Sequence, residues 1–330
     1  MGNLLKYPAL NTKIRGMKGK LLSEDELKEL LNESTIEDAL DFLKNKYEFI
    51  GEIHDRSSFE KEIYKLFVFD VLKLMKYLDF KERKLLHEYL LRYEISNIKD
   101  VFRHITTKRE IEVELKQIDL WTDNLFKEIK NIKEVKSENE FIDKIKDEEY
   151  YPVFEEYKDE LINAPIDKIE VELDKFYFKR VFNLYKDNKR LKEIIGKEID
   201  LLNIIWIYRS VKYYGYDKST INELLIPIDY KLSKKAKENL MEKTSFPEFL
   251  QVLNSTIYKN VFNDEKNLER DMYKYLYNLN KKVIKEEMFN ICFIFSYLSI
   301  LDIEIKNIIN IVEGIRYKID RQELKKKLIV

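Results

Sequence analysis

The sequence predicts an all-α fold made of three related helical lobes. Glycine and proline, which tight hairpin turns favour, number only 7 and 5 in a chain of 330 residues. Lys, Glu, Leu and Ile dominate instead, and apolar residues recur with helical spacing along nearly the whole chain. Two short sequence patterns each occur three times in the same phase, which indicates a diverged internal triplication.

The first repeated pattern is a Ser-x-x-Glu box. Its serines are Ser34, Ser137 and Ser245, which are separated by 103 and 108 residues. A serine at the N-cap and a glutamate three residues later satisfy the first amides of a helix reciprocally, so each box predicts a helix start. A tyrosine follows thirteen residues after each of these serines, and the three tyrosines are Tyr47, Tyr150 and Tyr258.

The second repeated pattern begins acid-x-x-Asn-Ile. Its acids and asparagines are, in order, Glu94 with Asn97, Asp200 with Asn203, and Glu304 with Asn307. The asparagines are separated by 106 and 104 residues, and on a helix the acid and the asparagine fall on one face. Either they hydrogen-bond across a helix–helix contact and fix the register within a lobe, or they bind a partner.

The tenth residue of this second pattern carries a charge on the opposite side of the helix. It is Arg103, Arg209 or Glu313 in the three copies. These charges are either simply solvated or line a central opening between the lobes. The third copy breaks a threefold ring of basic charge, and Arg316, one helical turn further on, is placed to compensate.

The triplication predicts where the chain divides. We expect an N-terminal helical segment over 1–33, followed by lobes over 34–120, 121–230 and 231–330. No Ser/Gly-rich linker separates these segments, so the lobes should pack together. The longest uncharged run, Met288 to Leu301, has 14 residues; a membrane span needs roughly 20, so the run predicts a core helix.

Composition and missing motifs exclude several classes of function. Charged residues make up 37% of the chain but nearly cancel, at a net charge of −1, and so create no global field that would attract nucleic acid or anionic lipid. There is no Gly-rich phosphate loop, no Gly-x-Ser-x-Gly and no Cys/His metal spacing, so we expect no catalytic activity, no cofactor and no metal. Cys292, the only cysteine, lies in an apolar run, which predicts a buried thiol and suits a reducing cytoplasm.

Three stretches together resemble one component of the rotary ATPases. They read Tyr-Pro-Ala-Leu-Asn-Thr-Lys-Ile-Arg-Gly-Met-Lys at 7–18, Glu-Ile-Asp-Leu-Leu-Asn-Ile-Ile-Trp-Ile-Tyr-Arg at 198–209, and Glu-Ile-Lys-Asn-Ile-Ile-Asn-Ile at 304–311. Their order and spacing are similar to those of the C subunit of bacterial and archaeal V/A-type ATPases, which corresponds to the d subunit of eukaryotic V-ATPases. The resemblance covers essentially the whole chain.

This resemblance implies a funnel of three helical lobes related by pseudo-threefold symmetry. In that family the protein is a non-catalytic part of the central stalk. It sits on the cytoplasmic face of the membrane rotor ring, which consists of proteolipid c/K-type subunits, and it receives the foot of the shaft, which is formed by the D and F subunits. The implied role is torque transmission for ATP-coupled proton or sodium transport, with attachment through the ring and no membrane span. The alternative is a helical-repeat scaffold that binds peptide or RNA.

Overall fold

The predicted all-α class is confirmed. The computed structural model describes residues 2–47, 53, 56–107, 132, 135, 137–158, 161, 165–287 and 290–329, and the regular structure within those residues is entirely helical. The chain forms two compact units, one made of 1–83 with 263–330 and the other of 84–262. We call them unit 1 and unit 2. The division into four segments at 33, 120 and 230 stays a prediction, and the boundary at 120 lies outside the described residues.

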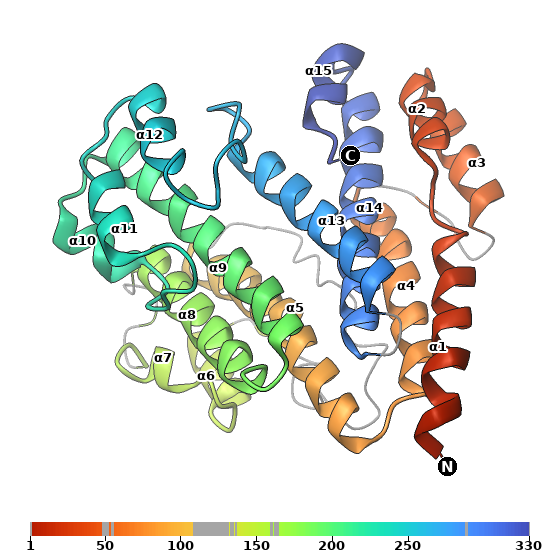
Figure 1. Cartoon of the computed structure of the whole chain (residues 1–330), viewed down its shortest axis with the longest axis horizontal. Coiled ribbons are helices and arrows are strands. Elements are labelled where there is room, and N and C mark those ends of the chain that lie inside the picture. The colour runs from red at the N-terminus through yellow and green to blue at the C-terminus, as the bar shows by residue number, and fades with distance from the viewer. Residues whose placement is uncertain are drawn as a thin grey trace. The chain divides into compact units, whose positions relative to one another are not determined.

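Unit 1 joins the two ends of the chain around one long helix. Its helices are α1 (Gly2–Lys18), α2 (Glu24–Asn32), α3 (Ile36–Lys46), α4 (Arg56–Met75), α13 (Leu268–Glu286), α14 (Cys292–Arg316) and α15 (Arg321–Lys327). Helix α14 contacts all six others, and most of its residues are buried (Figure 1). A helix that is apolar on nearly every side must lie in a core, as the uncharged run predicted.

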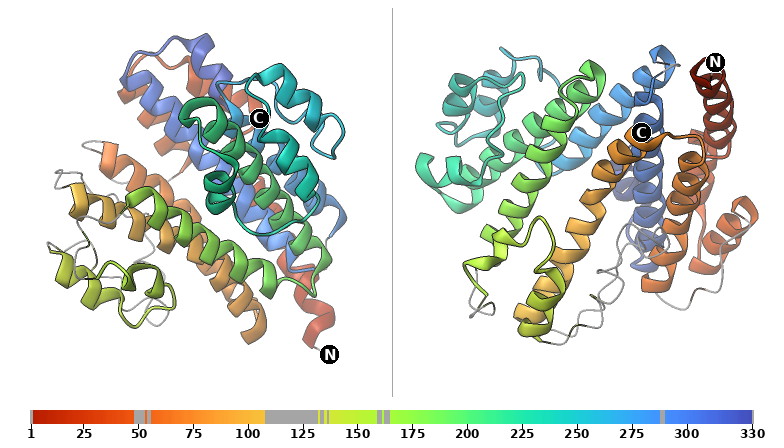
Figure 2. Two further views of the ribbon diagram at one scale, coloured as in Figure 1. Left: turned by 90° about the vertical axis from the view of Figure 1, so that its left-hand side faces the viewer. Right: turned by 90° about the horizontal axis from the view of Figure 1, so that it is seen from below.

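Unit 2 is organised around α9 in a similar way. After α5 (Phe80–Thr107), which begins in unit 1, its elements are α6 (Glu138–Ile145), α7 (Pro152–Glu155), α8 (Ile166–Leu184), α9 (Lys189–Arg209), the π-helix η4 (Ser210–Tyr214), α10 (Lys218–Leu224), α11 (Lys234–Leu240) and α12 (Phe246–Leu253). Helices α8 and α9 run side by side, and α10 and α11 also pack on α9 (Figure 2).

Two of the three predicted helix starts coincide with observed caps. Ser137 is the N-cap of α6, and its hydroxyl accepts the amide N–H of Glu140 at 3.3 Å. Ser245 is the N-cap of α12, where its hydroxyl donates to the Glu248 carboxylate at 2.6 Å. Pro247 lies in the first turn of this helix, where its missing N–H leaves no bond unmade.

The first predicted helix start is wrong by one residue. Thr35, not Ser34, is the N-cap of α3, and its hydroxyl accepts the amide N–H of Asp38 at 3.1 Å. Both residues carry a hydroxyl that can cap a helix, so the cap chemistry does not choose between them. The helix that follows Thr35 buries Ala39 and Leu43.

No helix within the described residues is long and apolar enough to cross a membrane. Cys292 lies at the start of α14 and is fully buried, as its apolar surroundings predicted.

Candidate functional site

The acid of the second pattern is buried in each copy, and in two copies it receives hydrogen bonds from distant segments. In unit 2, Asp200 on α9 accepts the hydroxyl of Tyr258 at 2.6 Å. Backbone N–H groups of residues 230, 231 and 232 donate to the same carboxylate at 3.4, 2.7 and 2.9 Å. Burial raises the pKa of Asp200, and the four hydrogen bonds oppose that rise because they favour the ionised form. We call such a buried acid, together with its donors, a carboxylate socket.

Unit 1 holds an equivalent carboxylate socket at Glu304 on α14. The Tyr47 hydroxyl donates to Glu304 at 2.8 Å, and the amide N–H of Leu22 donates to the same oxygen at 3.0 Å. These donors lie 257 and 282 residues away in sequence. Burial is the largest cause that raises the pKa of Glu304, to about 7. The socket therefore fastens the N-terminal segment onto the C-terminal helix.

The third acid, Glu94 on α5, forms a looser pair with Tyr150. Both residues are buried. Tyr150 lies close enough to Glu94 to lower the pKa of that carboxyl. The Tyr150 hydroxyl does not, however, reach full hydrogen-bond geometry with any described residue. Burial and, secondarily, repulsion by Glu148 raise the pKa of Glu94 to about 8. Residue 126, which follows Glu94 at the same distance in sequence as residue 232 follows Asp200, lies outside the described residues.

The three pairs follow one cyclic order. Each acid meets the tyrosine that belongs to the next Ser-x-x-Glu box along the chain, and the last acid meets the tyrosine of the first box. The pairs are Glu94 with Tyr150, Asp200 with Tyr258, and Glu304 with Tyr47. This order accounts for the presence of both chain ends in unit 1, because the N-terminal segment completes the packing around the last acid helix.

The asparagines of the pattern bind backbone rather than the neighbouring acid. The Asn203 side chain donates to the carbonyl of Ile226 at 3.0 Å and accepts its N–H at 2.9 Å. Asn307 makes the same two bonds to Ile329, at 3.0 and 2.8 Å. One side-chain amide thereby satisfies both polar groups of a buried residue. Asn97 is also buried, and the position 22 or 23 residues after it lies outside the described residues.

The chain is similar in sequence to proteins of a known family. The family model of the ATP synthase (C/AC39) subunit matches residues 10–327. The chain belongs to that family. It is 24% identical over 268 residues to the C subunit of the A-type ATP synthase of Methanosarcina acetivorans, covering 76% of this chain and 71% of the relative. The protein of the same name from Methanocaldococcus jannaschii is 22% identical over 352 aligned positions, which cover 99% of this chain and 87% of that protein. Members of the family are non-catalytic subunits.

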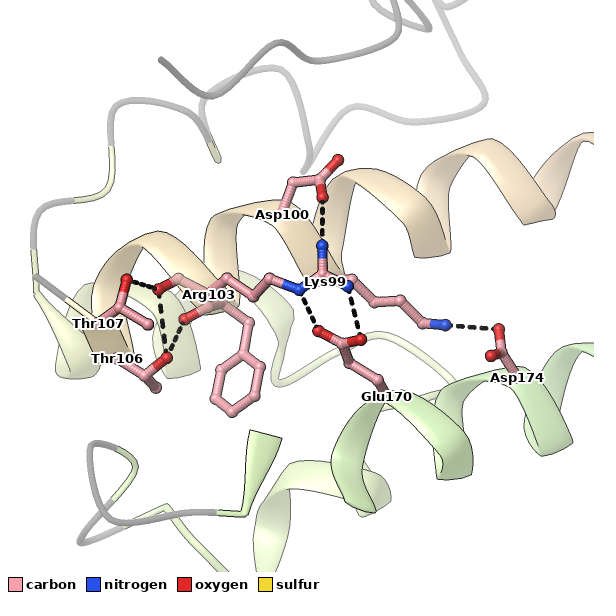
Figure 3. A network of polar contacts seen from close by, with 8 residues as sticks. Lys99, Asp100, Arg103, Thr106, Thr107, Glu170 and Asp174 are labelled. Carbon is pink, nitrogen blue, oxygen red and sulfur yellow. Dashed lines mark hydrogen bonds and ion pairs between the residues drawn. The ribbon is translucent and has the colours of Figure 1, made fainter. Parts of the chain in front are cut away.

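Within this family member, Arg103 lies in a surface ion-pair network between α5 and α8. Its guanidinium pairs with Glu170 at 2.5 Å and with Asp100 at 3.2 Å. One turn away on the same helix, Lys99 pairs with Asp174 at 2.5 Å (Figure 3). The arginine therefore helps join two helices while part of it remains exposed.

The other three predicted surface charges differ in burial. Arg209, the last residue of α9, is exposed. Glu313 is buried and pairs with Arg316 at 3.0 Å and with Arg56 at 3.8 Å. In the third copy, therefore, the two arginines partly neutralise the carboxylate of Glu313. The central opening that these residues were predicted to line stays a prediction.

Unit 1 has an open pocket of about 430 Å³, and charged side chains that line it form ion pairs with neighbouring residues. Lys306 pairs with Asp302 at 2.7 Å, and Arg270 pairs with Asp271 at 2.5 Å. In the part of the chain that the structure describes, no group of three His, Cys, Asp or Glu side chains is arranged to hold a metal ion.

Proposed function

We propose that this protein is the central-stalk connector of a V/A-type rotary ATPase. In this role it links the membrane rotor ring of proteolipid c/K-type subunits to the shaft, formed by the D and F subunits, on the cytoplasmic face. It transmits torque between them during ATP-coupled proton or sodium transport. Family membership over residues 10–327 and the A-type ATP synthase names of its relatives support this proposal.

The cyclic order of the three acid–tyrosine pairs is the observation that favours a connector most. A part that transmits torque must resist separation of its own segments under load. Breaking a socket would leave a buried acid and several buried donors without partners, and each unsatisfied group costs about 1–3 kcal/mol. Because the last socket fastens the N-terminal segment to α14, both ends of the chain are held in one body.

The proposed contact with the shaft uses the exposed charges of the second pattern. Arg103, Arg209 and the Glu313–Arg316 pair are the candidates. Of these, Arg209 is the candidate we test first, because it is exposed at the end of α9. We expect Arg209→Glu to weaken binding to the purified shaft at least several-fold while the melting temperature stays that of the wild type. Wild-type affinity in this variant would contradict the assignment of Arg209 to the shaft contact.

The proposed function is tested by a tagged pull-down of this chain from gently solubilised native membranes. Recovery of the small ring-forming proteolipid together with the D and F subunits is the expected result, and a tagged unrelated helical protein serves as the control. Recovery of neither, with the folded chain remaining in the soluble fraction, would overturn the connector function. Recovery of peptides or RNA in their place would favour the helical-repeat scaffold.

A further inference from the structure

The open pocket on unit 1 lies where α4, α13, α14 and α15 come together (Figure 1). Its volume of about 430 Å³ is that of a site for a small molecule. Of the side chains that line it, five are cationic and two are acidic. The pocket therefore has the charge of a site for an anion, provided that some of the cations are not already neutralised by the protein itself.

Three of the five cations are neutralised by ion pairs. The pairs are Lys306 with Asp302, Arg270 with Asp271, and Arg56 with Glu60. Lys266 and Lys327 are exposed and form no ion pair with any described residue. The nearby Asp264 does not line the pocket, and its carboxylate accepts the Lys266 backbone N–H at 3.0 Å and the Asn267 side chain at 2.7 Å. Two ammonium groups at the pocket are thus left for a ligand.

Two uncharged side chains in the pocket also have hydrogen-bond capacity to spare. Tyr64 on α4 is only 7% exposed, yet its hydroxyl forms no hydrogen bond within the described part of the chain. A buried polar group normally has a partner, so this hydroxyl is a candidate to bind a ligand. The Asn310 side chain on α14 likewise makes no hydrogen bond to a described residue.

The four available groups come from four different segments. Lys266 precedes α13, Tyr64 belongs to α4, Asn310 to α14 and Lys327 to α15. All four can donate a hydrogen bond. Folding of unit 1 therefore brings together donors that are separated by up to 263 residues in sequence, the distance from Tyr64 to Lys327.

The start of α13 adds to the attraction for an anion. Asn267, the N-cap of this 19-residue helix, lines the pocket and makes no side-chain cap hydrogen bond. The first amides of a helix have no partner within the helix and carry partial positive charge, which favours an anion beside them. Here the helix start supports a site that the side chains already define.

These donors call for a ligand that is anionic and rich in acceptors. A phosphate monoester offers three acceptor oxygens and nearly two negative charges near neutral pH, whereas a carboxylate offers two oxygens and one charge. The Tyr273 ring and the side chains of Ile309 and Ile329 also line the pocket, so the group that carries the phosphate can be apolar.

We propose that this pocket, the donor pocket, binds the phosphate group of a small phosphate monoester through Lys266, Lys327, Tyr64 and Asn310. The monoester belongs either to a soluble molecule or to the headgroup of a lipid such as phosphatidic acid. The inference does not rest on the proposed function, because the chain alone contains every residue of the donor pocket.

The test is isothermal titration calorimetry of the purified full chain with inorganic phosphate and with phenyl phosphate, at constant ionic strength. We expect saturable binding of one phenyl phosphate per chain. Replacing Lys266 and Lys327 together by alanine should weaken binding at least tenfold, because two charge-assisted hydrogen bonds are lost. Replacing Lys81 and Lys325, two exposed lysines that do not line the pocket, removes the same charge and should leave binding unchanged.

Tyr64→Phe tests the pocket without a change of charge. The buried ring stays and only the hydroxyl is lost, so we expect several-fold weaker binding and the melting temperature of the wild type. Binding equal to that of the wild type would contradict the assignment of Tyr64 as a donor. The two lysine variants should also keep the wild-type melting temperature, because none of these lysines forms an ion pair with a described residue.

Flotation with vesicles of phosphatidylcholine that contain phosphatidic acid distinguishes the two sources of the phosphate. Flotation that is lost on replacing Lys266 and Lys327 would place the monoester on a lipid. Calorimetric binding without flotation would place it on a soluble molecule. The donor pocket is overturned if the wild type binds neither phosphate compound nor the vesicles. It is also overturned if both lysine variants lose binding equally, since the attraction would then be a general effect of charge.

Discussion

The sockets of Asp200 and Glu304 carry the same sequence pattern but are satisfied differently. Asp200 accepts one tyrosine hydroxyl and three backbone N–H groups, all from residues within 58 positions along the chain. Glu304 accepts one tyrosine hydroxyl and one backbone N–H, from the opposite end of the chain. Burial raises the pKa of both acids, and for Glu304 it reaches about 7.

The difference shows that two buried acids at the same position of the pattern can have different numbers of hydrogen-bond donors opposing their desolvation. Four hydrogen bonds oppose the rise in the pKa of Asp200, whereas two oppose it at Glu304, whose pKa is about 7. The repeated pattern therefore surrounds its buried acid with more hydrogen-bond donors in unit 2 than in unit 1.

The largest expected effect comes from removing Asp200, the acid with more hydrogen-bond donors. Asp200→Ala should lower the free energy of unfolding by about 4 kcal/mol, because four donors lose their acceptor in a buried site. Glu304→Ala should cost about 2 kcal/mol, since only two donors lose theirs. Urea unfolding of the full chain measures both values. Asp200→Asn, which keeps one acceptor oxygen, is the matched control and should lose less than the alanine variant; equal losses for the two alanine variants would remove the contrast between the sockets.

Asn203 in unit 2 and Asn307 in unit 1 make the same two hydrogen bonds, so removing either side chain should have the same effect on stability. Asn203→Leu and Asn307→Leu should each lower the free energy of unfolding by about 3 kcal/mol, because each leaves one buried N–H and one buried carbonyl unpaired. The neighbouring acid loses no partner in Asn203→Leu, because Asp200 is held by other donors. Thermal or urea unfolding of the pair checks this; an effect below about 1 kcal/mol in either variant would show that the amide is replaceable there.

The smallest expected effect is a change in the free energy of unfolding with pH. The pKa of Glu304 is about 7 in the folded protein, above its ordinary value of 4.5, so between these pH values the folded state holds a proton that the unfolded state has released. The associated stability is fully present below about pH 4.5 and is lost as pH rises through 7, with a decline of about 2 kcal/mol between pH 5 and pH 7. Glu304→Gln cannot ionise and should lack this component of the decline.

The measurement is the difference in unfolding free energy between wild type and Glu304→Gln from pH 5 to pH 8. Glu94, with a pKa of about 8, contributes a decline of the same sign in both proteins and cancels in the difference. Parallel pH profiles for the two proteins would mean that Glu304 keeps an ordinary pKa.

Much of the local structure could be predicted from the sequence, whereas the partners of the buried acids could not. Helical spacing and the scarcity of glycine indicated the all-α class, and the serine boxes located the starts of α6 and α12. The pattern also placed Asp200 and Asn203 on one helical face. Periodicity describes a single element, however, and does not identify the segment that packs against it.

One signal for the pairing was present in the sequence. The tyrosine thirteen residues after each box serine recurs in all three copies, and in each copy it meets an acid of the other pattern. A strictly repeated polar aromatic residue beside a strictly repeated acid suggests a buried hydrogen bond. The cyclic order would still have been missed, because nothing in the sequence says that Tyr47 closes onto Glu304. The π-turn at the end of α9 was likewise missed, since a π-turn has no periodic signature and Gly215 was its only sequence marker.

In the proposed function, this protein physically joins the rotor ring to the shaft. The most direct measurement immobilises purified rotor rings in lipid nanodiscs and adds the D and F subunits of the shaft, with and without this chain. We predict that the rings retain the shaft only when the chain is present, and that a chain carrying Asp200→Ala, if it remains folded, retains less. Equal retention of the shaft in the absence of the chain, or no retention in its presence, would contradict the connector account.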